Sequence, residues 1–387
     1  MGEPKKVYIN CLRGVYKMSY VVSSILIFFS LIKKKSALLS LLLFIALWIL
    51  FGFNTGNADY YAYELQFNGT IKPPDIGFEF LLVFFNLIGF TYQQFLITIS
   101  LICYVIIFTS IKKYTENLSY VMALYFIYPF IFDVVQIRSF IALTILLYGL
   151  QYLFTNNKKD IFKYIFFVLV ASSIHFAFLF YLVLILVKFF PSWKKMLVIF
   201  SAFVILAILV IYSGFLAVLL NNLFNHPRID DWFKIGTNLG FLVPFLLQIM
   251  MFLFVYVSYR KYKDNIKVQI TNKDSQPFVN LNKKQKFITP NSQINFFETM
   301  IKINVIMFLA FPFYIYTTYF FRIYRNILIM NYIMVANSMQ YFFKDKYERF
   351  FYGLFFIIFL FILLMNELDP NSYLSVFRAI FENNILF

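Results

Sequence analysis

The sequence predicts an all-α integral membrane protein, a polytopic helical bundle of about 12 transmembrane segments. Composition is the first observation behind this prediction: of 387 residues, 61% are hydrophobic and only 13% are charged, and the mean hydropathy is +0.76. The second is that apolar stretches of about 20 residues, the length of a helix that crosses a bilayer, recur along nearly the whole chain. We therefore expect a single polytopic membrane domain over residues 1–387, with short broken or re-entrant helices around an outward-facing cavity.

The positions of the basic residues predict the topology. Lys and Arg outnumber Asp and Glu by 34 to 18, but they lie in short clusters at the ends of apolar stretches. This pattern is typical of cytoplasmic loops, so we expect membrane lipid around the chain and no nucleic-acid partner. The clusters taken as cytoplasmic markers are residues 33–35, 112–113, 158–163, 188–195, 260–286 and 344–349.

Apolar stretches between two cytoplasmic markers must cross the membrane in pairs. The expected pairs are 36–53 with 93–111, 119–133 with 139–155, 196–215 with 239–259, and 299–319 with 327–343. Residues 350–366 then exit, which leaves the C-terminus outside, whereas parity and the basic residues disagree about the side of the N-terminus. Residues 216–238 are expected as an extracytoplasmic loop and residues 260–298 as a basic cytoplasmic loop.

Two apolar stretches do not fit a simple span. As one helix, residues 161–190 would be about 45 Å long, whereas the hydrocarbon core is about 30 Å thick. We expect a hairpin that turns at "SSIHF" (172–176), with His175 part-way into the membrane from outside. Residues 77–90 are too short to span, so 54–92 is expected as an extracytoplasmic loop with a short embedded helix. Such interrupted segments need protein or a water-filled cavity around their backbone.

Polar residues on the predicted outer side form the candidate site. Arg138, in "DVVQIRSFIA" (133–142), is unusual inside an apolar stretch, and a guanidinium suits phosphate oxygens. A diphosphate arriving from the lipid side would supply its partner, and Arg322 and Arg325 are further candidates for holding it. Each arginine has a structural alternative, a carboxylate partner within the protein.

Other outer residues are candidates for proton transfer and for binding substrate. Asp59, His175 and Glu79 are the candidate general bases, and the sequence does not choose among them. Tyr60 and Tyr63 are candidate stacking surfaces for sugar rings, and Asp75 and Gln136 complete the predicted substrate-binding residues. Ordinary packing is the alternative for the tyrosines, and a hydrogen-bonded structural role is the alternative for His175.

Motifs for soluble nucleotide chemistry do not occur in the chain. It contains no P-loop, dinucleotide fingerprint, HExxH or paired CxxC. No metal and no other cofactor is expected, and any donor should already be carried by lipid.

Five stretches together resemble the EpsG-type, Wzy-like family of bacterial polysaccharide polymerases. They are "GNADYYAY" (56–63), "DIGFEFL" (75–81), "QIRSFIALTILLYG" (136–149), "VASSIHFAFLFYLVL" (170–184) and "YTTYFFRIYRN" (316–326). Each stretch is short, and their order and spacing carry the resemblance. The acidic residue of the family's first motif is matched by Asp59, and its histidine by His175. The family's two arginines are matched by Arg138 and Arg322. Family members commonly carry an arginine before the first stretch, where Phe53 and Asn54 stand here.

The resemblance implies a multi-pass protein of the bacterial cytoplasmic membrane whose active site faces outward. It implies transfer of a growing glycan from undecaprenyl diphosphate to a hydroxyl of the next lipid-linked repeat unit, with inversion and without a metal. Undecaprenyl-diphosphate-linked oligosaccharides would be both donor and acceptor, and a chain-length regulator and a flippase are the candidate protein partners. The alternatives are a flippase or transporter of lipid-linked oligosaccharide, which broken helices also suit, and another membrane transferase such as a ligase or an O-acyltransferase.

Overall fold

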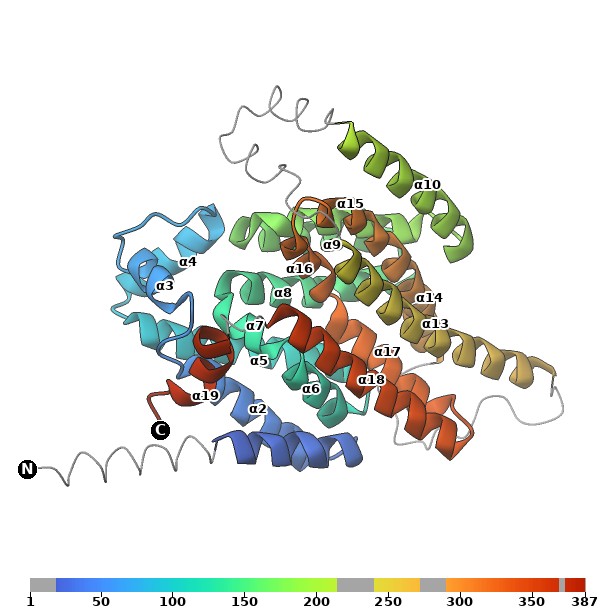
Figure 1. The fold of residues 1–387 in the computed structure, drawn as a ribbon, viewed down its shortest axis with the longest axis horizontal. Helices are drawn as coiled ribbons and strands as arrows, with labels where there is room; N and C mark the ends of the chain where they lie inside the picture. The colour runs from blue at the N-terminus through green and yellow to red at the C-terminus, as the bar shows by residue number, and fades with distance from the viewer. Residues whose placement is uncertain (1–18, 214–239, 272–289, 369–372, 387) are drawn as a thin grey trace, which may run out of the picture. The chain divides into compact units, whose positions relative to one another are not determined.

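The computed structural model describes residues 19–213, 240–271, 290–368 and 373–386 (Figure 1). Within these ranges the chain is helical, and its one β-type contact is an isolated antiparallel bridge between Asn54 and Asn384. The prediction of an all-α protein is confirmed for the described residues.

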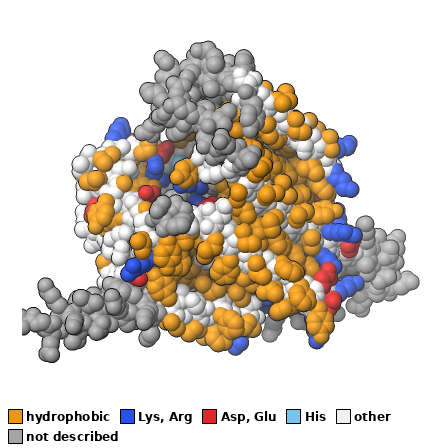
Figure 2. Space-filling model, in the orientation of Figure 1, with side chains coloured by type: hydrophobic (Ala, Val, Ile, Leu, Met, Phe, Trp, Pro, Cys, Tyr) orange, Lys and Arg blue, Asp and Glu red, His pale blue; other side chains and the backbone are white. Residues whose placement is uncertain are grey.

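Several helices have the length and apolarity of membrane spans. Among the described residues there are five of them: Tyr92–Lys112, Trp193–Ile211, Leu242–Asn265, Asn295–Tyr314 and Lys346–Glu367. Shorter apolar helices are Ser19–Ile32, Ala37–Gly52, Ile76–Leu87, Leu118–Ile127, Ile137–Leu153 and Phe176–Lys188. Hydrophobic side chains cover much of the face in Figure 2, with Lys and Arg side chains at its edge and also, beside acidic side chains, left of its centre. The chain is a multi-pass membrane protein, and the count of about 12 spans stays a prediction.

The residue contacts group the chain, which the sequence predicts as one domain, into two compact units. Unit 1 consists of residues 1–150, 166–179 and 345–387, and unit 2 of residues 151–165 and 180–344.

Unit 1 is built around α6 (Leu118–Ile127), in which every residue from 119 to 127 is buried. A helix that is apolar and buried on all sides belongs in the centre of a bundle. The helices that pack against it are α2 (Ala37–Gly52), α5 (Tyr92–Lys112) and α18 (Lys346–Glu367). The next helix along the chain, α8 (Ile137–Leu150), packs against α5.

Capping side chains set where the outer helices of unit 1 begin. Ser36 Oγ accepts a hydrogen bond from the Leu39 N–H at 3.2 Å, which starts α2. Thr91 and Gln94 form a capping box at the start of α5, each side chain bonding the other's backbone N–H. Such bonds satisfy N–H groups that the helix itself leaves without partners.

The predicted span 119–133 is interrupted. The helix α6 ends at Ile127, and α7 (Phe130–Val135) begins after Pro129. Proline has no N–H to donate into a continuing helix, and the residue before it is driven to an extended conformation, which Tyr128 adopts. The short α7 then leads directly to α8 and Arg138.

The hairpin predicted for residues 161–190 is confirmed. The first arm is α9 (Asp160–Ile174), and the second is the 3-10 helix η2 (Phe176–Lys188). The Tyr164 hydroxyl on one arm donates to the Tyr181 carbonyl on the other at 2.8 Å, so the arms run side by side. The helical path breaks at His175, where the sequence predicts the turn.

Unit 2 is built around α17 (Leu328–Tyr341), whose residues 328–339 are all buried. The helices α13 (Leu242–Thr271) and α14 (Pro290–Ile306) pack against α17, and α10 (Trp193–Tyr212) packs against α14. The helix α13 runs to Thr271, well past residue 260, where the sequence predicts a loop to begin. One reason is that Glu298 of α14 pairs with Lys263 and accepts from the Tyr259 hydroxyl at 3.0 Å, which holds this basic stretch on the bundle.

The predicted extracytoplasmic loop 216–238 lies outside the described residues. The predicted loop 54–92 contains two helices, α3 (Tyr60–Phe67) and α4 (Ile76–Leu87), which contact each other.

Candidate functional site

Arg138 lies where two helices of unit 1 meet. Gln136 ends α7, and its carbonyl accepts from the Phe140 N–H at 3.0 Å, which starts α8. Arg138 is therefore in the first turn of α8, and its side chain is 23% exposed. Asp133, earlier in the same stretch, is buried in α7 and accepts from the Tyr125 hydroxyl at 2.9 Å.

A carboxylate is the partner of Arg138. Its Nη1 lies 2.7 Å from Asp75 Oδ2, and the Asp75 side chain is only 10% exposed. The guanidinium also lies over the ring of Tyr63, 5.8 Å from the centroid, which is within the range of a cation–π contact. The arginine's Nε is buried and makes no hydrogen bond within the described structure.

Asp75 also reaches the turn of the hairpin. Its Oδ1 accepts from the backbone N–H of Phe176 at 3.1 Å. Phe176 is the first residue of η2 and directly follows His175. One carboxylate thus joins the starts of α4, α8 and η2, three segments that lie far apart in the sequence.

A glycine allows α4 to approach the hairpin this closely. A Cβ on Gly77 would lie 2.3 Å from Ser173 Oγ and 2.8 Å from the Ser173 carbonyl carbon. Only glycine fits at such a distance. Gly77 and Ser173 belong to the stretches "DIGFEFL" and "VASSIHFAFLFYLVL", so their meeting explains one residue in each.

Each of the three candidate bases lies within four residues in the sequence of Asp75 or of a residue that contacts Asp75 or Arg138. His175 directly follows α9 and lies half-buried, with its ring 5.8 Å from that of Phe178. Glu79 is one helical turn beyond Asp75 and lies 3.5 Å from Lys72. Asp59 precedes α3, one turn before Tyr63, and its backbone N–H bonds the Asn57 side chain at 3.1 Å.

The rings of Tyr60 and Tyr63 are both packed inside unit 1, each only 7% exposed. The Tyr60 hydroxyl donates to Gln93 Oε1 at 3.0 Å, and Gln93 Nε2 donates to the Gly52 carbonyl at 2.6 Å. Burial, with a smaller contribution from the charge of Glu64, raises the pKa of Tyr60 to about 12, so its hydroxyl stays protonated. The aromatic side chain that this helix exposes is Tyr61.

Arg322 and Arg325 lie in unit 2, on the short helix α16 (Phe321–Arg325). Arg322 is exposed, and its guanidinium lies 5.0 Å from the ring centroid of Tyr319, which is also exposed. Arg325 is only 2% exposed. The two arginines therefore differ in their access to a ligand.

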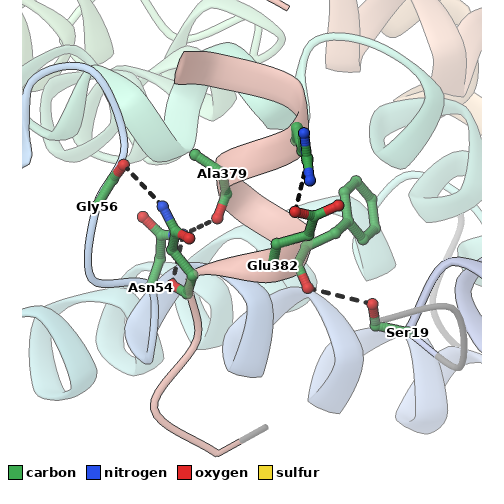
Figure 3. A network of polar contacts seen from close by, with 8 residues as sticks. Ser19, Asn54, Gly56, Ala379 and Glu382 are labelled. Atoms are coloured by element: carbon green, nitrogen blue, oxygen red, sulfur yellow. Dashed lines mark hydrogen bonds and ion pairs between the residues drawn. The ribbon is translucent and has the colours of Figure 1, made fainter. Parts of the chain in front are cut away.

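The loop that follows α2 is fixed by the C-terminal segment (Figure 3). Asn54, fully buried, donates to the carbonyls of Ala379 and Asn383 at 2.9 and 3.1 Å. The Asn383 side chain donates back to the Gly56 carbonyl at 3.2 Å. The amide of Asn54 therefore has a structural role at the place where family members commonly carry an arginine.

Sequence reasoning missed two features of this site. It did not pair Asp75 with Arg138, and it did not predict that the C-terminal segment docks on residues 54–56. The signal for the second was weak: "ENN" (382–384) offers amide side chains after a short apolar helix. Among the described residues, no group of three His, Cys, Asp or Glu is placed to bind a metal ion.

The comparison with known families bears on most of the chain. No curated protein and no solved structure matches it. The model of the EpsG family matches residues 37–377, a range that contains all five of the stretches discussed above. The resemblance stated from those stretches is thereby confirmed, and the chain belongs to the EpsG family.

Proposed function

We propose that this protein is a polysaccharide polymerase that uses lipid-linked glycans at the outer face of the bacterial cytoplasmic membrane. The donor would be a growing glycan on undecaprenyl diphosphate, and the acceptor a hydroxyl of the next lipid-linked repeat unit. Family membership supports a polymerase-type glycosyltransferase in a membrane. The observation that carries the proposal is Arg138, a partly exposed guanidinium held at the meeting point of α4, α8 and the hairpin turn.

The proposed reaction is an inverting transfer. A general base takes the proton of the acceptor hydroxyl, the oxygen bonds to the anomeric carbon, and undecaprenyl diphosphate leaves. Arg138 would stabilise the charge that develops on the leaving diphosphate, since a fixed cation in a site of low polarity is effective there. Asp59, His175 and Glu79 are the proposed candidates for the base, and Tyr60, Tyr63 and Gln136 are proposed to support the substrate.

Arg322 and Arg325 are proposed as further diphosphate ligands. Exposure favours Arg322 for this role, because a 2% exposed Arg325 must uncover itself before a ligand can reach it. A chain-length regulator and a flippase are the proposed protein partners, since a polymerase of this type needs repeat units delivered to the outer leaflet.

The test replaces the gene in its host with Arg138→Ala or Arg138→Lys variants of matched membrane level. Lipid-linked glycans are then extracted and separated by size. We expect single repeat units to accumulate on lipid in the outer leaflet and long polymer to fall by about 100-fold or more. Lys offers a point charge in place of the forked guanidinium, and Ala offers no charge at all.

Other outcomes would identify other functions. Repeat units that accumulate in the cytoplasmic leaflet would indicate a flippase, and polymer of normal length and amount would remove Arg138 from the site. Parallel Asp59→Asn, His175→Ala and Glu79→Gln variants separate the candidate bases, and Arg322→Ala tests the second arginine. The partly exposed Glu116→Gln, which removes the partner of Lys35 just before α2, is the control that should leave polymer unchanged.

A further inference from the structure

The carboxylate of Asp75 is not used by its own helix. Asp75 is the N-cap residue of α4 and has the extended backbone of a cap, with φ −113° and ψ 126°. An N-cap Asp ordinarily accepts from an N–H in the first turn of its helix, which stabilises the helix. Asp75 makes no such bond within the described structure. Both of its oxygens instead bond to other segments.

One oxygen fixes the direction of Arg138. Asp75 Oδ2 accepts from Nη1 at 2.7 Å, and the guanidinium lies over the Tyr63 ring at 5.8 Å from its centroid. Because the guanidinium is planar and rigid, a hydrogen bond at one nitrogen together with the cation–π contact restricts its orientation. The remaining donors then point in a defined direction.

The other oxygen fixes the turn that carries His175. The first N–H groups of a helix have no partner inside that helix. Asp75 Oδ1 supplies one to Phe176, at 3.1 Å, from a residue 101 positions away in the sequence. His175 is the residue immediately before, so its backbone is held from the same carboxylate.

We infer that Asp75 is a positioning residue: it orients Arg138 toward the diphosphate and fixes the hairpin turn at His175, and it does not itself bind the glycan. This replaces the substrate-binding role predicted from the sequence. The inference deepens the proposed function and rests on it for the meaning of the activity measurement.

The experiment is a double-mutant cycle in the full-length protein. Asp75→Asn, Arg138→Ala and the double variant are compared for polymer formed from lipid-linked repeat units, per molecule of protein that elutes as a single folded species in detergent. We expect Asp75→Asn alone to lower this activity by about 10- to 100-fold, the equivalent of losing a hydrogen bond to a charged group. In the Arg138→Ala background the same substitution should cost less than about 3-fold, since residues that act through one another are not additive.

A purely structural role would give a different result. It would lower the amount of folded protein but leave the activity per folded molecule unchanged. Glu116→Gln is the matched control, because it removes the acid of another ion pair in unit 1, 2.6 Å from Lys35, and should leave activity unchanged. Asp75→Asn with full activity per folded molecule, or costs that multiply in the double variant, would overturn the inference.

Thermal unfolding of the unmodified protein, the two single variants and the double variant separates this inference from the proposed function. We expect the two single variants to lower the midpoint and the double variant to lower it by less than the sum of both. If the unmodified protein makes no polymer, the proposed function fails and the midpoints alone judge the pairing. Additive midpoints in that case would show that Asp75 and Arg138 act separately, and the inference would fail too.

Discussion

At the scale of single residues, Gly77 decides whether the site assembles. Its Cα faces Ser173 so closely that Gly77→Ala forces a methyl group against both the hydroxyl and the backbone of α9. Overpacking of this kind costs about 1–3 kcal/mol, because one of the two helices must move. We expect a lower midpoint of thermal unfolding in detergent and a loss of polymer, since the move also separates Asp75 from Phe176.

The matched control is Ile76→Ala, next to Gly77 in the same turn and strongly exposed. It should change the midpoint little. Ser173→Gly should recover part of the loss in the Gly77→Ala background, because it removes the nearest atom while the backbone contact remains. A Gly77→Ala protein that unfolds at the same temperature as its parent would contradict the close approach.

At the scale of elements, the C-terminal helix α19 (Ala379–Glu382) packs against the end of α2. The contact is polar: the Asn54 amide faces two carbonyl oxygens, and Ser19 Oγ donates to the Phe381 carbonyl at 3.2 Å (Figure 3). Asn54→Asp replaces the donor with an oxygen that repels both carbonyls. We expect a loss of about 1–3 kcal/mol, the cost of leaving buried acceptors unsatisfied.

Limited proteolysis measures this effect directly, because α19 should be released before the rest of the protein unfolds. The control is Asn68→Asp, the same substitution at an exposed residue after α3, which should leave the cleavage rate unchanged. If the Asn54→Asp and Asn68→Asp proteins are cleaved at the same rate, the docking of α19 on α2 does not depend on the Asn54 amide.

The elements also show how far the sequence could be read. The hairpin over residues 161–190 could be predicted locally, because one helix of 30 residues is longer than the hydrocarbon core and predicted cytoplasmic markers lie at both of its ends. The partner of Arg138 did not follow, since Asp75 is 63 positions away and the chain has 18 acidic residues to choose from. The break before α7 was also missed, although Pro129 marks it, because hydropathy averages over such a residue.

At the scale of the whole molecule, the positive clusters predict which end of each unit faces the cytoplasm. In unit 1, the two ends of α2 can be compared, because 16 residues span about 24 Å. Before its start, Lys35 pairs with Glu116 at 2.6 Å and the Lys33 carbonyl accepts from Ser119 Oγ at 2.9 Å. Lys33 and Lys35 belong to a predicted cytoplasmic marker, whereas Asn54, just after the far end of α2, bonds to Ala379 and Asn383, which are predicted to lie outside.

This arrangement predicts the labelling pattern of single cysteines in intact cells stripped of their outer layers. In a Cys11→Ser parent, Lys72→Cys and Ile385→Cys should react with a membrane-impermeant maleimide, and Lys33→Cys only after the membrane is opened. All three side chains are exposed, and the native Cys103 is buried and should stay silent. Asn383 is bonded to the loop that follows α2, so the C-terminal segment and this loop must lie on the same side of the membrane. If Ile385→Cys reacts only after the membrane is opened, as Lys33→Cys should, the topology is contradicted.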